Sequence, residues 1–171
     1  DDVLADLDAG VGGMRIAVWE AGLAQADPAV AATVRAAIEA LASAGARVSE
    51  IVLPRAEELL ATQLAIIGTE AYAFHRERFD AEPERYGEDV RARIARGKAT
   101  TGATYASARR TRSEIRAAFD ALLGSYDSLA LPVTVTGAPH REGADAVAIA
   151  ARLTALTSPF NLTGLPAISV P

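Results

Sequence analysis

A strand–helix–strand pattern near the start of the chain restricts the fold more than any other feature. Residues 14–19 have the pattern of a strand, and residues 48–53 have the pattern of a second one. Between them, Asp27 takes the N-cap position of a helix, Pro28 takes its first position, and Gly45 ends it. Because a connection that contains a helix joins parallel strands, we expect a right-handed βαβ unit. The sequence therefore predicts an α/β fold.

The rest of the chain is expected to add long helices over a mixed sheet. Helices are predicted over residues 57–79, 88–96, 103–123 and 145–157, and a further strand over residues 129–133. An apolar stripe on each long helix is expected to face the core. These stripes are Val30, Val34, Ile38 and Leu41; Leu60, Leu64, Ile67, Ala71 and Phe74; and Tyr105, Ala108, Ile115, Phe119 and Leu122. We expect residues 1–171 to form a single α/β domain.

The C-terminal segment carries strong local signals. Pro159 is expected to end the preceding helix at Thr157, because the residue before a proline disfavours helical geometry. Asn161 and Gly164 are expected to form a turn, since both residue types tolerate a positive φ. Residues 165–170 then have the pattern of a short buried strand. A folded domain rarely stops on a core strand, so we expect a domain that is cut at this end.

This segment also carries a family resemblance. The motif Asn-Leu-Thr-Gly-Leu-Pro at residues 161–166 closely resembles the segment that follows the catalytic region in amidase signature enzymes. Those enzymes are serine amidohydrolases, and they include the A subunit of the glutamine-dependent amidotransferases. Further segments resemble the same family in the same order, at residues 13–18, 27–30, 48–54, 90–97 and 126–132. The resemblance implies the C-terminal portion of an amidase signature domain, truncated at both ends.

The catalytic residues of that family are absent from this sequence. The family uses a serine nucleophile, a bridging serine and a lysine base in a loop rich in glycine and serine. Lys98 is the only lysine, and no serine lies in such a loop, in a Gly-x-Ser-x-Gly elbow or in a Ser-x-x-Lys pair. A serine hydroxyl needs a neighbouring base to become a nucleophile at neutral pH. We therefore expect no catalytic residue in this chain, and no amide hydrolysis by the chain alone.

Composition excludes several classes of function. A net charge of -5 argues against a nucleic-acid partner, because such proteins carry a basic surface. The longest apolar stretch, residues 59–74, is interrupted by polar residues and indicates a buried helix, not a membrane span. His75 and His140 lack the spacing of metal ligands, so neither a metal nor another cofactor is expected. We expect a cytoplasmic protein that binds a small-molecule amide. The sequence leaves open whether the protein forms a homo-oligomer.

Two charged residues interrupt the predicted apolar stripes and are expected to have structural roles. Glu70 lies between Ile67 and Phe74 on one helix, and Arg112 lies within the stripe of the helix over 103–123. Because an unpaired buried charge costs several kcal/mol, each needs a partner. We expect the two to pair across packed helices or one of them to face a polar pocket; the alternative is that both are solvated.

The resemblance also implies three substrate-binding positions. Arg93 lies in an Arg-x-x-x-Gly pattern that, in the A subunits of the amidotransferases, supplies an arginine to the carboxylate of the substrate. Thr154 stands where those proteins have an aspartate for the substrate's ammonium group, so a less charged amide is favoured. Phe160 is expected either to line the acyl pocket or to belong to the core. The alternative for Arg93 is an ordinary solvated arginine.

Three functions remain open on this sequence. The leading one is a part of an amidase that hydrolyses a carboxylic amide to an acid and ammonia or an amine through a serine acyl-enzyme. In it, this segment supplies scaffold and pocket wall. The second is a non-catalytic α/β binding or regulatory module. The third is the A subunit of a glutamine-dependent tRNA amidotransferase, which Thr154 and the acidic pI of 5.1 disfavour.

Overall fold

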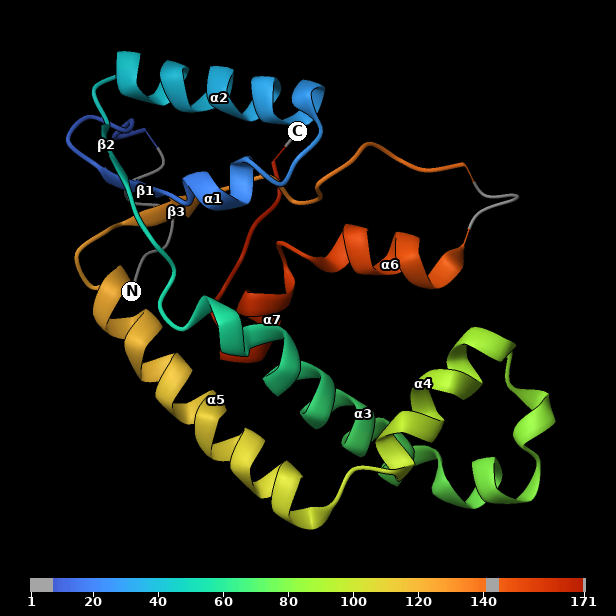
Figure 1. The fold of residues 1–171 in the computed structure, drawn as a ribbon. Coiled ribbons are helices and arrows are strands. Elements are labelled where there is room, and N and C mark those ends of the chain that lie inside the picture. The colour runs from blue at the N-terminus through green and yellow to red at the C-terminus, as the bar shows by residue number, and fades with distance from the viewer. Residues whose placement is uncertain (1–7, 141–144, 171) are drawn as a thin grey trace.

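The computed structural model describes residues 8–140 and 145–170, which form a small parallel sheet and a larger helical part (Figure 1). In chain order the elements are β1 (Arg15–Val18), α1 (Glu20–Leu23), α2 (Pro28–Ser43), β2 (Arg47–Glu50), α3 (Ala56–Ala81), the 3-10 helix η1 (Pro83–Arg85), α4 (Glu88–Lys98), α5 (Gly102–Leu123), β3 (Ser128–Ala130), α6 (Ala146–Thr154) and α7 (Ser158–Thr163). Within these ranges, no helix has the length and apolar character that crossing a membrane requires.

The three described strands are ordered β2-β1-β3, and both pairs are parallel. Ile16 at the centre lies opposite Val48 on β2 and Ser128 on β3. The α/β fold and the parallel βαβ start are thus confirmed. The antiparallel strand that would make the sheet mixed is not among the strands of residues 8–140 and 145–170. Each strand is also shorter than the sequence predicts.

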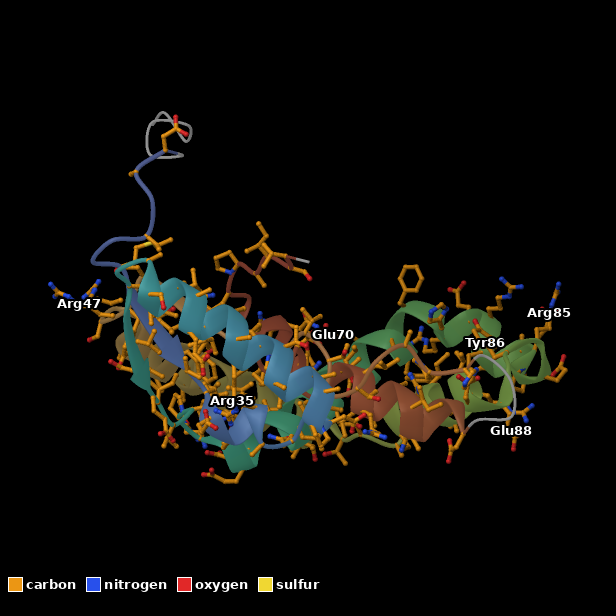
Figure 2. All side chains as sticks on the ribbon, turned by 90° about the horizontal axis from the view of Figure 1, so that it is seen from above. Arg35, Arg47, Glu70, Arg85, Tyr86 and Glu88 are labelled. Atoms are coloured by element: carbon orange, nitrogen blue, oxygen red, sulfur yellow. The ribbon has the colours of Figure 1, made fainter. Side chains whose placement is uncertain are left out.

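Helix α2 lies over one face of the sheet, and α3, α5 and α7 lie over the other (Figure 1). The core fills the space on the second side. Its buried members are Ala17, Trp19, Ile51, Leu53, Leu59, Ile66, Ala108, Ile115, Phe119, Val135, Leu156 and Leu162. At the far end, η1 and α4 pack on the second half of α3, away from the sheet. Figure 2 shows the resulting elongated shape, with Arg47 near one end and Arg85 near the other.

The predicted start of α2 is present with one change in its hydrogen bonding. Asp27 is the N-cap residue and Pro28 follows it, but the Asp27 side chain makes no capping hydrogen bond. Its Oδ1 instead accepts a hydrogen bond of 2.8 Å from Arg152 on α6. Gly45, with φ of 97°, provides the left-handed residue after the helix. Asp27 therefore connects α2 to α6 where the sequence predicts a purely local role.

The predicted apolar face of α3 is wrong. Leu60, Leu64, Ile67 and Phe74 are 63%, 57%, 55% and 84% exposed, whereas the face that is buried carries Leu59, Thr62, Ile66 and Phe79. Leu59 and Leu60, and Ile66 and Ile67, are apolar neighbours on adjacent faces, so periodicity alone does not select the face that packs on α5 and α7. In α5, by contrast, Ala108, Ile115 and Phe119 are buried as predicted.

The end of the chain differs most from the sequence prediction. The predicted helix over 145–157 ends at Thr154, and a further helix, α7, begins at Ser158. Pro159 lies in the first turn of α7, where its missing N–H costs no hydrogen bond. Asn161 is therefore helical and not in a turn. Residues 165–170 form no strand, and Ile168 is 87% exposed, since no strand of the described chain lies beside them.

Helices α3 and α4 cross at two glycines. A Cβ atom built on Gly97 would lie 1.9 Å from the carbonyl oxygen of Gly68, whereas one built on Gly68 would come no closer than 3.4 Å to Gly97. The contact therefore requires glycine on α4 but not on α3. We expect Gly97→Ala to lower the free energy of unfolding by about 1–3 kcal/mol, because the backbones must move apart.

Gly68→Ala is the matched control, since it adds a methyl group to the same contact. We expect it to be neutral or stabilising by up to about 1 kcal/mol, because alanine favours a helix over glycine. Urea unfolding of the two variants measures both effects. Equal destabilisation by the two substitutions would contradict the asymmetric crossing.

An ion pair at the N-terminal ends of the strands connects β1 to the residue that precedes β3. Asp127 accepts hydrogen bonds from the backbone N of Arg15 at 2.7 Å and from its Nη2 at 2.8 Å. The hydrogen bond from the Arg15 guanidinium is the main cause that lowers the pKa of Asp127 from 3.8 to about 2. The ionised carboxylate therefore favours the folded chain.

Because this pKa is lower in the folded chain than in the unfolded one, the stabilisation is present above pH 3.8 and is lost as the pH falls toward 2. We expect the difference in melting temperature between the native chain and Asp127→Asn to be constant near neutral pH and to shrink over that acid range. Thermal melts from pH 7 to pH 2 measure it. A difference that does not change over the acid range would show that Asp127 does not titrate in this way.

Candidate functional site

The candidate site is the corner where α7 ends against α5. The C-terminal carbonyl groups of a helix lack partners within the helix, and cationic side chains are favoured near them. Here Arg112 Nε donates to the Leu162 carbonyl oxygen at 2.6 Å, and Arg116 Nη1 donates to that of Thr163 at 2.6 Å. Gly164 follows with the positive φ, 71°, that the sequence predicts. Two arginines of α5 thus hold the end of α7.

These arginines border a hollow of about 250 Å³, lined by Arg109, Arg112, Ser113, Arg116 and Thr163. Arg116 also forms an i,i+4 ion pair with Asp120, with Nε 2.9 Å from Oδ1. The Thr163 hydroxyl is buried and donates to the Pro159 carbonyl oxygen at 2.8 Å. Sequence reasoning identified Arg112 but not Arg109 or Arg116. Their spacing of three and four residues from Arg112, which places all of them on one helix face, was the available signal.

Glu70 and Arg112 do not form the expected pair. Glu70 Oε1 accepts a hydrogen bond from the Tyr105 hydroxyl at 2.8 Å, and Arg109 Nη1 lies 3.4 Å from the same oxygen. The Glu70 side chain is 52% exposed, so it lies at the edge of the contact between α3 and α5 and not inside it. Arg112 has the carbonyl oxygen of Leu162 as its partner instead. A charge within an apolar stripe did need a partner, and a helix end supplies it.

The predicted substrate residues lie on three different helices. Arg93 is exposed on α4, and the residue that follows it, Ile94, is buried. Thr154 is exposed at the end of α6, and its Oγ1 donates to the Ala150 carbonyl oxygen at 2.8 Å. Phe160 on α7 is half-buried and packs edge-on against Phe119, with ring centroids 6.3 Å apart. Among the described residues, no hydrogen bond, ion pair or ring contact joins these side chains to one another.

Asn161 and Phe160 are neighbours with different surroundings. Asn161 is exposed on α7, whereas Leu162 and Thr163 beside it are buried. The packing of Phe160 against Phe119 supports its alternative as a core residue and fixes one side of α7. The exposed amide of Asn161 remains available to a group outside the described residues.

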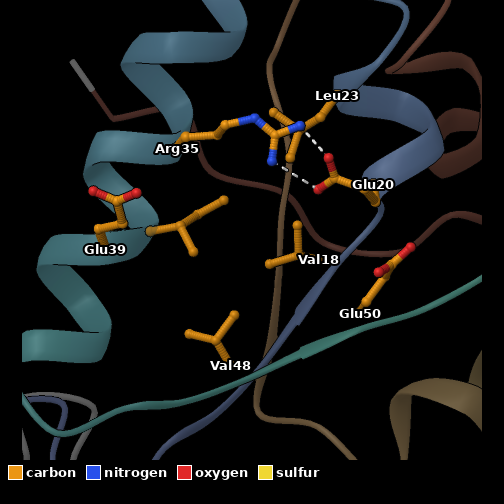
Figure 3. Close-up of a pocket in the computed structure, with 8 residues that line it drawn as sticks. Val18, Glu20, Leu23, Arg35, Glu39, Val48 and Glu50 are labelled. Carbon is orange, nitrogen blue, oxygen red and sulfur yellow. Dashed lines mark hydrogen bonds and ion pairs between the residues drawn. The ribbon is translucent and has the colours of Figure 1, made fainter.

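A second hollow, of about 230 Å³, lies between α2 and the sheet (Figure 3). Val18, Leu23, Ile38 and Val48 form its apolar lining, and Glu20, Arg35, Glu39 and Glu50 its polar lining. Arg35 donates to both carboxylate oxygens of Glu20, and this hydrogen bonding lowers the pKa of Glu20. Glu20 is therefore ionised at neutral pH and is not suited to act as a general acid. None of the described residues that line this hollow is a serine, lysine or histidine, so its lining offers no amidase nucleophile.

The only lysine of the sequence is held in an ion pair and lines neither hollow. Lys98 Nζ lies 2.7 Å from Asp80 Oδ1 and 5.7 Å from the centre of the Tyr72 ring. The hydrogen bond to Asp80 raises the pKa of Lys98, which keeps the ammonium protonated. A protonated lysine cannot accept a proton from serine. Within residues 8–140 and 145–170, no group of three His, Asp or Glu side chains could hold a metal ion.

The contact at the end of α7 predicts a specific stability effect. We expect Arg112→Ala to lower the free energy of unfolding by about 2 kcal/mol, because a charge-assisted hydrogen bond to a half-buried carbonyl is lost. Arg110→Ala is the control on the same helix. Arg110 is 78% exposed and lies 3.6 Å from Glu114, so its loss should change the stability by less than about 0.5 kcal/mol. Urea unfolding of both variants is the measurement, and equal effects would contradict the role of Arg112.

Comparison with known proteins places these features in a family. The model of the family described as Amidase matches residues 2–171. The chain is 32% identical to an amidase of Pseudomonas putida, over 85% of this chain and 33% of that protein. It is 33% identical to the A subunit of the glutamyl-tRNA(Gln) amidotransferase of Synechococcus sp. (strain RCC307), over 99% of this chain and 40% of that protein.

Solved structures agree with the sequence relatives. A crystal structure of an amidase matches 94% of this chain and 40% of its own chain, with a TM-score of 0.80 and 26% identity. The A subunit of the Thermotoga maritima glutamyl-tRNA(Gln) amidotransferase matches with a TM-score of 0.72 and 28% identity, over 98% of this chain and 37% of that one. This chain thus spans 33% to 40% of the length of these relatives. The chain belongs to the amidase signature family.

Proposed function

We propose that this chain is a part of an amidase that hydrolyses a carboxylic amide to an acid and ammonia or an amine. A serine of the enzyme attacks the amide carbonyl, the amine leaves with a proton, and water then hydrolyses the serine ester to release the acid. In this proposal residues 1–171 form a single α/β domain portion that supplies scaffold and pocket wall. The serine and its base come from a part of the domain that this chain does not span.

Two observations together support this proposal. The family model matches nearly the whole of this chain, and the only lysine of the chain is not suited to act as the catalytic base. The Amidase match covers residues 2–171, so the whole chain follows the family. Yet its only lysine, at the end of α4, is protonated and forms an ion pair with Asp80 over the ring of Tyr72. A chain of this family that lacks the catalytic base can position the substrate but cannot accept the proton of the serine. The isolated chain is therefore proposed to be inactive.

Within the proposed pocket wall, Arg93 binds an anionic group of the substrate. It is exposed on α4 and is not used in an ion pair among the described residues. Thr154 lacks the charge that would hold an ammonium group, which favours a less charged amide over glutamine. Phe160 is half-buried against Phe119, and in this proposal the part of its ring that stays exposed lines the acyl pocket.

A second candidate, the A subunit of an amidotransferase, has its own support. The Synechococcus relative is as similar to this chain as the Pseudomonas amidase is, at 33% and 32% identity. The two candidates differ in the substrate, because the amidotransferase needs a site for the ammonium group of glutamine and Thr154 provides no charge there. We therefore propose the general amidase first. In this proposal the enzyme works in the cytoplasm on a small-molecule amide, and formation of a homo-oligomer is compatible with it.

A chimera tests the function: the Pseudomonas putida amidase in which this chain replaces the segment that it matches. We expect the chimera to hydrolyse amides and the isolated chain to give no turnover above a buffer blank. In the chimera, Arg93→Ala should lower kcat/KM for amides that carry a carboxylate roughly 10- to 150-fold, from the loss of about 1.5–3 kcal/mol of charge-assisted hydrogen bonding. Steady-state kinetics with a carboxylate-bearing and a neutral amide measure this.

Arg91→Ala is the matched control, because Arg91 is exposed on the same helix but outside the family pattern. We expect Arg91→Ala to leave kcat/KM unchanged for both the carboxylate-bearing and the neutral amide. Turnover by the isolated chain would disprove the proposed division of the catalytic residues. Equal effects of the two arginine substitutions would disprove the role of Arg93, and faster hydrolysis of glutamine than of neutral amides would favour the amidotransferase.

A further inference from the structure

Helix α3 has two apolar faces, and only one of them is covered in the described chain. Leu59, Thr62 and Ile66 are buried against the core. On the other face lie Leu60, Leu64, Ile67, Ala71 and Phe74, which we term the α3 stripe. Its four large members are 55% to 84% exposed. Single exposed apolar residues are ordinary, but a contiguous stripe of them marks an interaction surface.

The spacing within the α3 stripe identifies the shape of its partner. Successive members are separated by four, three, four and three residues. This is the alternation that keeps one seam of a helix facing a second helix along its whole length. The stripe covers 15 residues from first to last, and the 14 steps between them, at 1.5 Å each, make roughly 21 Å, or about four helical turns. A partner helix of that length matches the stripe, whereas a strand or a loop would not require this repeat.

A polar group next to the stripe also lacks a partner. Gln63 lies three residues after Leu60 and four before Ile67, so it borders the stripe on the same side of α3. Its Oε1 is buried and has no hydrogen-bond partner among the described residues. Such an atom destabilises a fold by about 1–3 kcal/mol unless a donor is supplied. A neighbouring element that packs on the stripe is in a position to bring that donor.

The relatives indicate where the partner helix comes from. This chain spans 33% of the Pseudomonas putida amidase and 40% of the crystallised amidase, yet it superposes on the latter over 94% of its own length with a TM-score of 0.80. The same fold thus occurs within a protein of which the larger part lies outside the matched segment. We propose that a helix of about four turns, from the part of the amidase domain that this chain does not span, packs on the α3 stripe. This rests on the proposed function, in which the chain is a portion of a larger amidase.

Cysteine labelling tests the proposal, because the chain contains no cysteine. Leu64→Cys is introduced into the isolated chain and into the chimera with the Pseudomonas putida amidase, and the labelled position is identified by peptide mass spectrometry. We expect fast labelling in the isolated chain. In the chimera the rate should fall by at least roughly tenfold, because a residue in a helix–helix contact reacts only during local opening. Equal rates would overturn the proposal.

A second measurement does not depend on the chimera. The isolated chain is co-expressed with the remaining part of the Pseudomonas putida amidase, and the two are purified together. We expect Leu64→Glu to abolish their association and Arg110→Glu, an exposed change on α5, to preserve it. Association that is insensitive to Leu64→Glu overturns the proposal, as does the absence of both association and protection.

The measurements also distinguish the proposed helix from other occupants of the α3 stripe, and the helix contact from the proposed function. If size measurements show that the isolated chain forms a dimer that Leu64→Glu dissociates, a second copy covers the stripe and the proposal is wrong. Neither readout depends on turnover. If the thiol of the Leu64→Cys variant is protected in an inactive chimera, the helix contact is supported and the function is not. A reactive thiol in an active chimera would support the proposed function and contradict the helix contact.

Discussion

The packing of one face of α5 against α3 and α7 is the interaction on which the rest of the structure depends. Ile115 and Phe119 are completely buried at its centre, and Leu156 and Leu162 reach the same core from the end of the chain. Segments that lie far apart in sequence thus meet on one helix. Because burial of large apolar side chains is the main favourable term in folding, this layer holds α7 in its place.

Arg112 is compatible with this layer only because α7 ends beside it. An arginine within an apolar stripe needs acceptors, and the C-terminal carbonyl groups of a helix need donors. The hydrogen bond from Arg112 to Leu162 satisfies both requirements, and Arg116 repeats the arrangement at Thr163. The proposed pocket residues of α7 are therefore positioned by α5. Arg93 is positioned separately, through the glycine crossing of α3 and α4, so the geometry of the proposed pocket depends on two independent contacts.

The sequence predicted those features that depend on residues close together in the chain. The stripe of α5 has one apolar face, so its phase was determined, and the charge at Arg112 correctly indicated a need for a partner. The acceptor itself was not predictable, because it is a backbone carbonyl 50 residues away. The prediction for α3 failed because Leu59, Leu60 and Ile66, Ile67 are apolar pairs on adjacent faces. The sequence predicts that Pro159 ends a helix, whereas Pro159 lies in the first turn of α7, because a proline is tolerated at both places.

The two largest departures from prediction have a common physical origin. The stripe of α3 and the strand pattern of residues 165–170 are both sequence signals for burial, and both are exposed in the described chain. A helix stripe needs a facing helix, and a strand needs a neighbouring strand to complete its hydrogen bonds. Neither partner lies within residues 8–140 and 145–170. The same holds for the chemistry, since Lys98 is committed to Asp80 and no other lysine exists in the sequence. Packing, strand pairing and proton transfer are three separate requirements, and the proposed function assigns all three to the part of the amidase domain that this chain does not span.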